Sequence, residues 1–106
     1  MGISVVINAY NEEANIADCI QSLLDQTRKA DEIILVDNGS TDRTYQIASR
    51  YPVRLERISF SKRGHARDVG WRASSGDLVL YGDADNVFDE NWIEEITKRL
   101  RDYDGV

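Results

Sequence analysis

The sequence predicts an α/β domain whose sheet is doubly wound, mostly parallel and four-stranded. Four short strand-like runs alternate with four segments that carry apolar residues at helical spacing. Most of the runs are β-branched and apolar on both faces, as expected of strands that helices cover on each side. Because crossovers between parallel strands are right-handed, this alternation places helices on both faces of one sheet. The chain has 106 residues, enough for one domain over positions 1–106.

The first strand is predicted at Ile3–Asn8, and a short turn leads from it into a helix. Asn11 is expected to cap this helix, and Glu12 and Glu13 suit its first turn, where the macrodipole favours negative charge. The helix is expected to end near residues 26–27. Its apolar stripe consists of Ile16, Cys19, Ile20, Leu23 and Leu24.

The second strand is predicted at Glu32–Asp37. Asn38-Gly39 would suit a hairpin between two strands, but helical spacing follows it, so we interpret the pair as a strand-to-helix turn. Ser40 and Thr41 are expected to cap this second helix. Its packed face consists of Thr44, Ile47, Ala48 and Tyr51.

The second half of the chain repeats the pattern, with a third strand at Val53–Ser59 and a fourth at Leu78–Tyr81. The third strand is more polar than the others, which predicts a place near an edge of the sheet. A loop at residues 60–64 leads into a helix whose small residues suit close packing on the sheet. This small face consists of Ala66, Val69, Gly70 and Ala73. The last, amphipathic helix has an apolar face of Trp92, Ile93, Ile96, Leu100 and Tyr103.

Composition and charge narrow the classes of function. The net charge of −6 disfavours non-specific binding to nucleic acid or an anionic membrane, but it permits a local site for a small phosphate ligand. The single cysteine, Cys19, excludes an intrachain disulfide, and its place on an apolar stripe predicts that it is buried. No apolar run approaches the roughly 18 residues of a membrane span. We therefore expect a cytoplasmic protein, or one associated with membranes through other parts or partners.

Polar side chains follow the ends of three predicted strands. Tyr10, Asn11 and Glu12 follow the first strand, Asp37 and Asn38 lie at the end of the second, and Asp83 and Asp85 follow the last. Ligands of open parallel sheets bind outside the carboxyl ends of the strands, so these residues are expected to share one site. Two close carboxylates repel each other unless they are solvated or share a cation, and Mg²⁺ takes such ligands together with substrate phosphates. A metal and phosphate site is therefore favoured over a solvated acidic turn.

Four segments resemble family 2 glycosyltransferases in order and spacing. They are VVINAYNEE (residues 5–13), ILVDNGSTDRT (34–44), GHARDVG (64–70) and GDAD (82–85). The resemblance implies a GT-A type fold, in which a Rossmann-like nucleotide-binding half joins an acceptor-binding half. It implies inverting transfer of a sugar from a nucleotide-sugar, often a UDP-sugar, with Mg²⁺ or Mn²⁺. These 106 residues would be the N-terminal, donor-binding half of a longer catalytic domain.

The same resemblance implies roles for the nucleoside-binding residues. Ala9, Tyr10 and Glu12 would line the nucleoside pocket. Asp37 would accept a hydrogen bond from the base N–H, which suits a carboxylate because the base imide is a donor.

For the ribose and the diphosphate, the resemblance implies that Asp83 contacts the sugar ring. Asp85 would ligate the divalent metal, whose charge stabilises the diphosphate leaving group. Arg67 lies where the family has a basic residue near the nucleotide, and Lys62 and Arg63 could add positive charge from the same loop. Asp68 departs from the asparagine that the family often carries at this point.

The resemblance places the general base in the acceptor half, so no catalytic base is assigned here. The alternative function is a catalytically inactive fragment or an assembly module that keeps only the fold. Without the second half, the strand at Leu78–Tyr81 would present an open apolar edge, which predicts pairing into a homodimer. A receiver domain, a nucleotidyltransferase and a dinucleotide-binding oxidoreductase are disfavoured, because the late lysine, the basic glycine-rich loop and G-x-G-x-x-G are absent.

Overall fold

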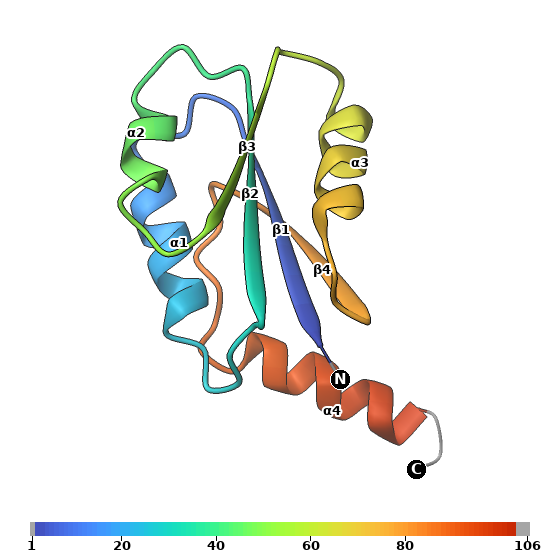
Figure 1. Ribbon diagram of the computed structural model, residues 1–106. Helices are drawn as coiled ribbons and strands as arrows, with labels where there is room; N and C mark the ends of the chain where they lie inside the picture. Colours follow the sequence, from blue (N-terminus) through green and yellow to red (C-terminus); the bar gives the residue numbers. More distant parts are fainter. Residues whose placement is uncertain (1, 104–106) are drawn as a thin grey trace.

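The computed structural model of the chain describes residues 2–103 and confirms the predicted alternation of strands and helices (Figure 1). The elements are β1 (Ile3–Ala9), α1 (Ile16–Leu24), β2 (Glu32–Asn38), α2 (Thr44–Ala48), β3 (Arg54–Ile58), α3 (Arg63–Ala73), β4 (Leu78–Asp83) and α4 (Trp92–Tyr103). The strands pair in the order β3-β2-β1-β4, and all of these pairings are parallel. The polar strand β3 lies at one edge, as predicted, and β4 lies at the other.

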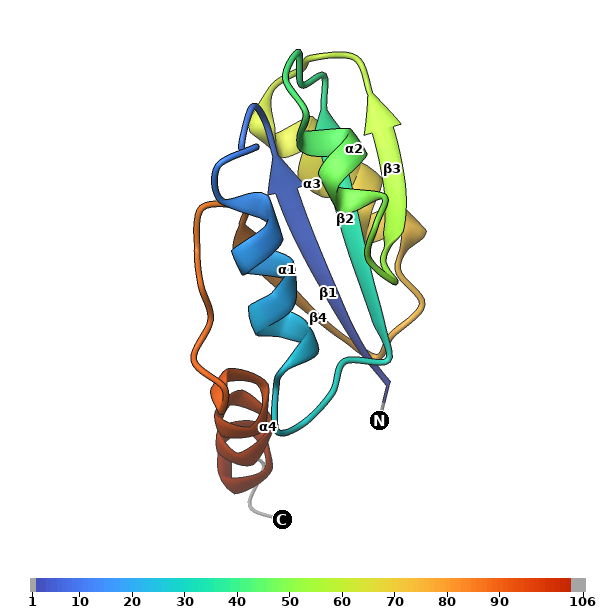
Figure 2. The ribbon, with the colours of Figure 1, turned by 90° about the vertical axis from the view of Figure 1, so that its left-hand side faces the viewer.

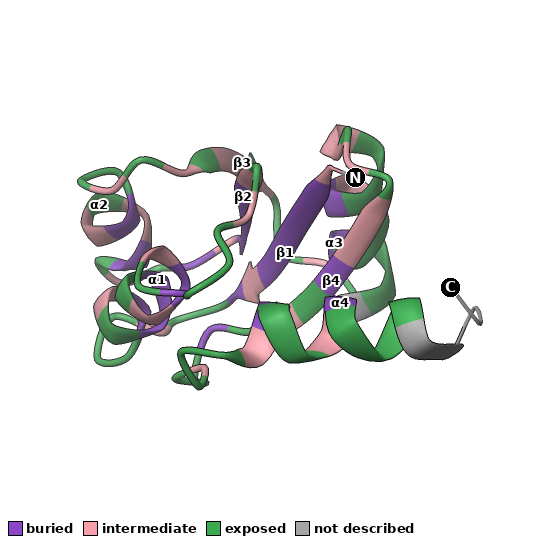
Figure 3. Cartoon of the chain, turned by 90° about the horizontal axis from the view of Figure 1, so that it is seen from below, coloured by how far each residue is buried: buried purple, intermediate pink, exposed green. Residues whose placement is uncertain are grey.

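Helices cover both faces of the sheet (Figures 1 and 2). α1 and α2 lie on one face and α3 lies on the other, while α4 crosses near the amino ends of the strands. The larger core lies on the α1 side, where Ile7 and Leu35 of the sheet pack with Ile20 of α1 and Ile93 of α4. Cys19 belongs to this core and is fully buried, as predicted. The outer side of α4 is exposed (Figure 3).

The smaller core lies between α3 and the other face of the sheet. Val6, Ile34 and Val36 pack there against Ala66. Gly70 faces the same strands, and a Cβ atom at this position would overlap a methyl group of Val6. The predicted small-residue face is confirmed, and its physical role is to let the helix approach the sheet closely.

The predicted cap of α1 is wrong. The helix begins at Ile16, after a turn in which the Glu12 carbonyl accepts hydrogen bonds from the N–H groups of Asn15 and Ile16. Glu12 and Glu13 therefore precede the helix instead of forming its first turn. Asn11 lies still earlier and has a left-handed backbone (φ 51°), which asparagine tolerates better than most residues.

The predicted caps of α2 are also wrong. Neither Ser40 nor Thr41 is next to the first helical residue, Thr44, whose N–H group bonds to the side chain of Asp42 instead (2.9 Å). The helix is short, so Tyr51 lies beyond its end, although this side chain still packs against the larger core. The residues predicted as caps are used for contacts between loops.

Candidate nucleotide-binding site

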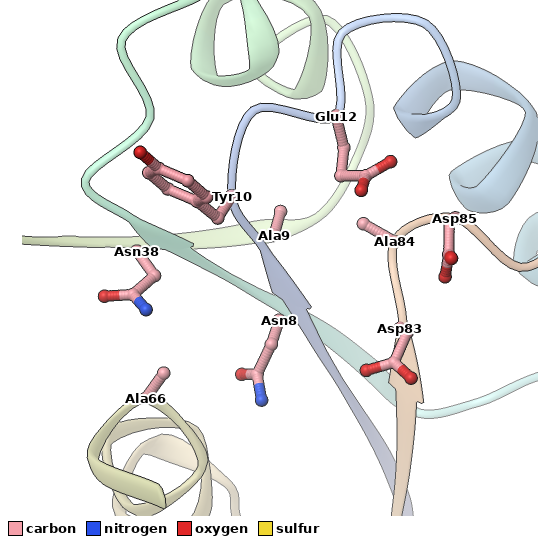
Figure 4. A pocket seen from close by; sticks show the side chains of 9 residues that line it. All are labelled: Asn8, Ala9, Tyr10, Glu12, Asn38, Ala66, Asp83, Ala84 and Asp85. Atoms are coloured by element: carbon pink, nitrogen blue, oxygen red, sulfur yellow. The ribbon is translucent and has the colours of Figure 1, made fainter. Parts of the chain in front are cut away.

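A pocket lies outside the carboxyl ends of β1, β2 and β4, beside the point where the strand order reverses between β1 and β4 (Figure 4). Ligands of open α/β sheets bind at such a point. The pocket has a volume of about 310 Å³. Its lining consists of Asn8, Ala9, Tyr10, Glu12, Asn38, Ala66, Asp83, Ala84 and Asp85. The fold therefore brings together the predicted residues Ala9, Tyr10, Glu12, Asp83 and Asp85.

Strand alternation decides which polar side chains reach the α3 side of this pocket. Asn8 and Asp83 are neighbours in the pairing of β1 with β4, and Asn8 is paired with Val36 on β2. Asn38 lies two residues beyond Val36 and therefore on the same face of the sheet. The side chains of Asn8, Asn38 and Asp83 thus all belong to the face that α3 covers (Figure 4). Asn38 is among the polar residues expected at the strand ends, although no role is predicted for it, whereas Asn8 is absent from the predicted site. The only signal for Asn8 in the sequence is an amide at the end of an apolar strand.

Hydrogen bonds between two loops hold the rim of the pocket. The Asn11 N–H donates to the Ser40 hydroxyl oxygen (2.9 Å), and the Glu12 N–H donates to the Thr44 hydroxyl oxygen (2.8 Å). In the other direction, the Thr41 N–H donates to the side-chain oxygen of Asn11 (2.8 Å). The loop after β1 is thus fastened to the loop after β2, which holds Glu12 at the pocket.

An aromatic pair lies beside the pocket. The Tyr10 ring is 45% exposed, and its centroid lies 4.7 Å from that of Phe60. Gly39 makes room for Phe60, because a Cβ atom on Gly39 would lie 2.5 Å from the Phe60 backbone nitrogen. The backbone of Gly39 is also left-handed (φ 73°), a conformation that glycine adopts without strain. The Phe60 ring is tilted by 55° against the Tyr10 ring, so the exposed face of Tyr10 by itself offers a flat apolar surface to a planar ligand.

Three carboxylates, those of Glu12, Asp83 and Asp85, line the pocket and make its potential negative. Their field reaches Cys19, whose Sγ lies 3.8 Å from the backbone oxygen of Asp83. Burial, and after it the charges of Asp85, Glu12 and Asp83, raise the pKa of the Cys19 thiol to about 12. The thiol is therefore neutral at ordinary pH. The same field attracts cations to the pocket.

The carboxylates fit a metal that is shared with a phosphate ligand. Among residues 2–103, no cluster of three or more histidine, cysteine, aspartate or glutamate side chains could hold a metal ion. Asp85 is exposed at the pocket and presents carboxylate oxygens, which suit Mg²⁺ or Mn²⁺. Mg²⁺ is commonly held by one or two carboxylates while water and substrate phosphates complete its coordination. The donor set thus fits a shared metal rather than a closed protein site.

Asp37 lies away from the pocket, in contrast to its predicted role. Its side chain is fully buried on the α1 side of the sheet, because it precedes Asn38 by one residue on the strand. One carboxylate oxygen accepts the Ser40 N–H (3.2 Å), and the other lies 3.6 Å from the Nε atom of Arg57. The geometry assigns this carboxylate to the turn after β2 and does not support its predicted contact with a base.

Arg67 also lies outside the pocket lining. α3 begins at Arg63, so Arg67 is exposed on a helix and does not share a loop with Lys62 as predicted. Its guanidinium carbon lies 5.7 Å from the centroid of the Tyr81 ring, within the range of a cation–π contact. Arg67 is therefore not gathered with the carboxylates at the strand ends.

Comparison with known proteins shows the family of this chain. The model of glycosyl transferase family 2 matches residues 4–106. The chain belongs to this family. Among its relatives, Glycosyltransferase GlyG from Streptococcus pneumoniae is 32% identical over 97% of this chain, and Cholesterol galactosyltransferase from Borreliella burgdorferi is 31% identical over 93%. The chain spans only 36% and 30% of these two proteins.

Solved structures of similar proteins confirm that this chain has the GT-A type, Rossmann-like fold. S. aureus TarS in complex with UDP-GlcNAc aligns with a TM-score of 0.82 and 26% identity, covering 96% of this chain and 32% of that one. Glucosyl-3-phosphoglycerate synthase from Mycobacterium tuberculosis, in complex with Mn²⁺, UDP and glucosyl-3-phosphoglycerate, aligns with a TM-score of 0.82 and 30% identity. That alignment covers 93% of this chain and 39% of the synthase.

Proposed function

We propose that this chain is the donor-binding part of an inverting, metal-dependent glycosyltransferase, and that its donor is a UDP-sugar. The observation that carries the proposal is the meeting of Tyr10, Glu12, Asp83 and Asp85 in one pocket at the reversal of strand order. Two similar structures are complexes with UDP-GlcNAc and with UDP and Mn²⁺, which supports a uridine diphosphate as the ligand class.

The nucleoside is proposed to bind on the side of Ala9 and Tyr10. The exposed Tyr10 ring, backed by Phe60, suits stacking with a base. Asp83 lines the pocket on β4 and offers carboxylate oxygens to the ribose hydroxyl groups, which are hydrogen-bond donors. Glu12 faces the same pocket and is held by the loop contacts described above.

The diphosphate is proposed to bind beside Asp85, through a divalent metal. Three carboxylates line the pocket, and a diphosphate would be repelled from them unless a cation intervened. When bound, Mg²⁺ or Mn²⁺ would neutralise the charge that develops on the diphosphate leaving group. Arg67 could add positive charge only after a change of side-chain position, because it lies outside the pocket lining.

We assign no residue of this chain to binding of the acceptor, to binding of the transferred sugar or to the role of general base. Since the chain spans about a third of its relatives, we propose that it binds donor but transfers sugar poorly alone. The other candidate is an assembly module that keeps the family fold without donor affinity. Among residues 2–103, no helix has the length and apolar character to cross a bilayer. A cytoplasmic setting stays a prediction.

Calorimetric titration of UDP with and without Mn²⁺ tests the proposal. We expect affinity that rises with Mn²⁺ and an Asp85→Ala variant that loses this rise, because the variant lacks the proposed metal ligand. Asp25→Ala is the matched control, since Asp25 is exposed at the far end of α1 and is not part of the pocket. Absence of UDP binding with or without metal would refute donor binding and favour the assembly module.

A further inference from the structure

Gln26 is a polar side chain buried just beyond the end of α1. It is 1% exposed and lies two positions after Leu24, the last residue of the helix. Its Nε2 atom donates to the Ser22 carbonyl (3.1 Å) and to the Asp89 carbonyl (2.6 Å), and its Oε1 atom accepts from the Ile93 N–H (3.0 Å). One amide group therefore joins α1, the segment after β4 and the first turn of α4.

The segment that Gln26 holds, residues 84–91, also carries Asp85. These residues, all of which the structure describes, form neither helix nor strand, so contacts with other elements determine the path of the backbone. Directly after β4, the Asn86 N–H donates to the Asp83 carbonyl (3.1 Å), and Asp85 lies within this turn. The Asp85 side chain is exposed at the pocket, so the backbone of the segment decides where its carboxylate lies.

Beyond this turn, the segment is fastened to the end of α1. The Phe88 N–H donates to the Ser22 hydroxyl oxygen (3.0 Å), and the Thr27 N–H donates to the Glu90 carbonyl (2.8 Å). The bonds of Gln26 lie between these two contacts. Gln26 is more deeply buried than Ser22 or Thr27, so water cannot readily replace its bonds if the side chain is changed. Gln26 is thus the contact whose loss should displace the segment most.

We propose that Gln26 is a positioning residue for the divalent metal, because it fixes the segment from which Asp85 reaches the pocket. This inference rests on the proposed function, in which Asp85 is the metal ligand. A metal ion binds oxygen ligands at narrowly defined distances, so a ligand needs a supporting structure that holds it in place. Asp83 is different, since it is the last residue of β4 and the sheet holds it (Figure 4). Loss of Gln26 should therefore weaken the metal site and spare the contact proposed for the ribose.

The test separates binding of UDP alone from the gain in UDP affinity that Mn²⁺ brings. Gln26→Met keeps the length of the side chain and removes its three hydrogen bonds. By calorimetry, we expect the gain from Mn²⁺ to fall at least fivefold, while the affinity for UDP without metal stays within twofold of the wild type. A merely structural role would not move these two quantities apart.

Ser4→Ala is the matched control. Ser4 is also fully buried, and its hydroxyl group joins two elements, donating to Glu32 (2.6 Å) and accepting the Gly76 N–H (2.9 Å). It lies near the start of β1, away from the pocket. We expect both variants to melt below the wild type, but Ser4→Ala should keep the full gain from Mn²⁺.

A folded Gln26→Met variant that keeps the gain from Mn²⁺ overturns the inference, as does one that loses affinity equally with and without metal. If this variant does not fold, Ser22→Ala decides, because it releases the Phe88 N–H from α1 and leaves Gln26 in place. We expect a smaller loss of the Mn²⁺ gain in Ser22→Ala, and an unchanged gain then overturns the inference. If the wild type itself gains nothing from Mn²⁺ or does not bind UDP, the proposed function fails, and the role of Gln26 fails with it.

Discussion

A variant of Thr44 tests most directly whether hydrogen bonds hold the rim of the pocket. The side chain of Thr44 is fully buried, and its hydroxyl group accepts the Glu12 N–H (2.8 Å) while donating to the carboxylate of Asp42. Thr44→Val keeps the shape of the side chain and removes both of these bonds. The Glu12 N–H then loses its partner in a partly buried place, and Asp42 keeps the Thr44 N–H (2.9 Å).

The expected loss follows from those bonds. A partly buried N–H that loses its acceptor costs about 1–3 kcal/mol, so we expect the free energy of unfolding to fall by about 2 kcal/mol. For a domain of this size, that corresponds to a melting temperature lower by about 10 °C. The measurement is urea and thermal unfolding followed by circular dichroism. Because Glu12 faces the pocket, affinity for UDP should fall as well.

Thr97→Val is the matched control. Thr97 is also buried and helical, but its hydroxyl group donates only to the Glu94 carbonyl within α4 (2.9 Å). We expect this variant to lose less than about 1 kcal/mol and to keep its affinity for UDP. If both variants lose the same stability and neither changes UDP binding, the bond from the Glu12 N–H does not hold the rim of the pocket.

Two further predictions concern the core and the edge of the sheet. The pKa of the Cys19 thiol is raised from 9.0 to about 12 in the folded state. Between these two pH values the thiol ionises in the unfolded chain but stays neutral in the folded one. The contribution of the neutral, buried thiol to stability is therefore fully present below pH 9 and is lost as the pH rises toward 12. In metal-free buffer, the excess stability of the wild type over Cys19→Ala should therefore shrink by about 1.4 kcal/mol per pH unit in that range; an excess that does not change with pH contradicts the raised pKa. The second prediction concerns β4, an edge strand in which Tyr81 is 38% exposed: we expect light scattering to show a dimer that Tyr81→Glu shifts toward monomer. A wild type that stays monomeric at high concentration would refute pairing through this edge.

The sequence determines most of the fold because the signals involved are local. The spacing of apolar residues places α4 at Trp92–Tyr103, and the apolar runs place β1, β2 and β4 to within two residues of their observed ends. Small residues on α3 predict its close approach to the sheet, which the overlap at Gly70 confirms. The order of the four motifs is also enough to identify the family. The motifs and their spacing can be recognised in the sequence without knowing which residues contact each other in the fold.

The tertiary structure alone decides which polar residues meet. Asn11, Ser40 and Thr41 are types that cap helices, and local preference assigns them that role. Instead, contacts across about thirty positions of the chain engage them between two loops, at a distance that no local pattern encodes. Strand parity has the same effect at the site. Asp37 and Asn38 are adjacent in the sequence, but the alternation of side chains buries the carboxylate on the α1 side and brings the amide to the pocket. The sequence thus determines that polar groups gather at the carboxyl edge of the sheet, whereas the register of the strands and the face that each helix covers decide which of them a ligand can reach.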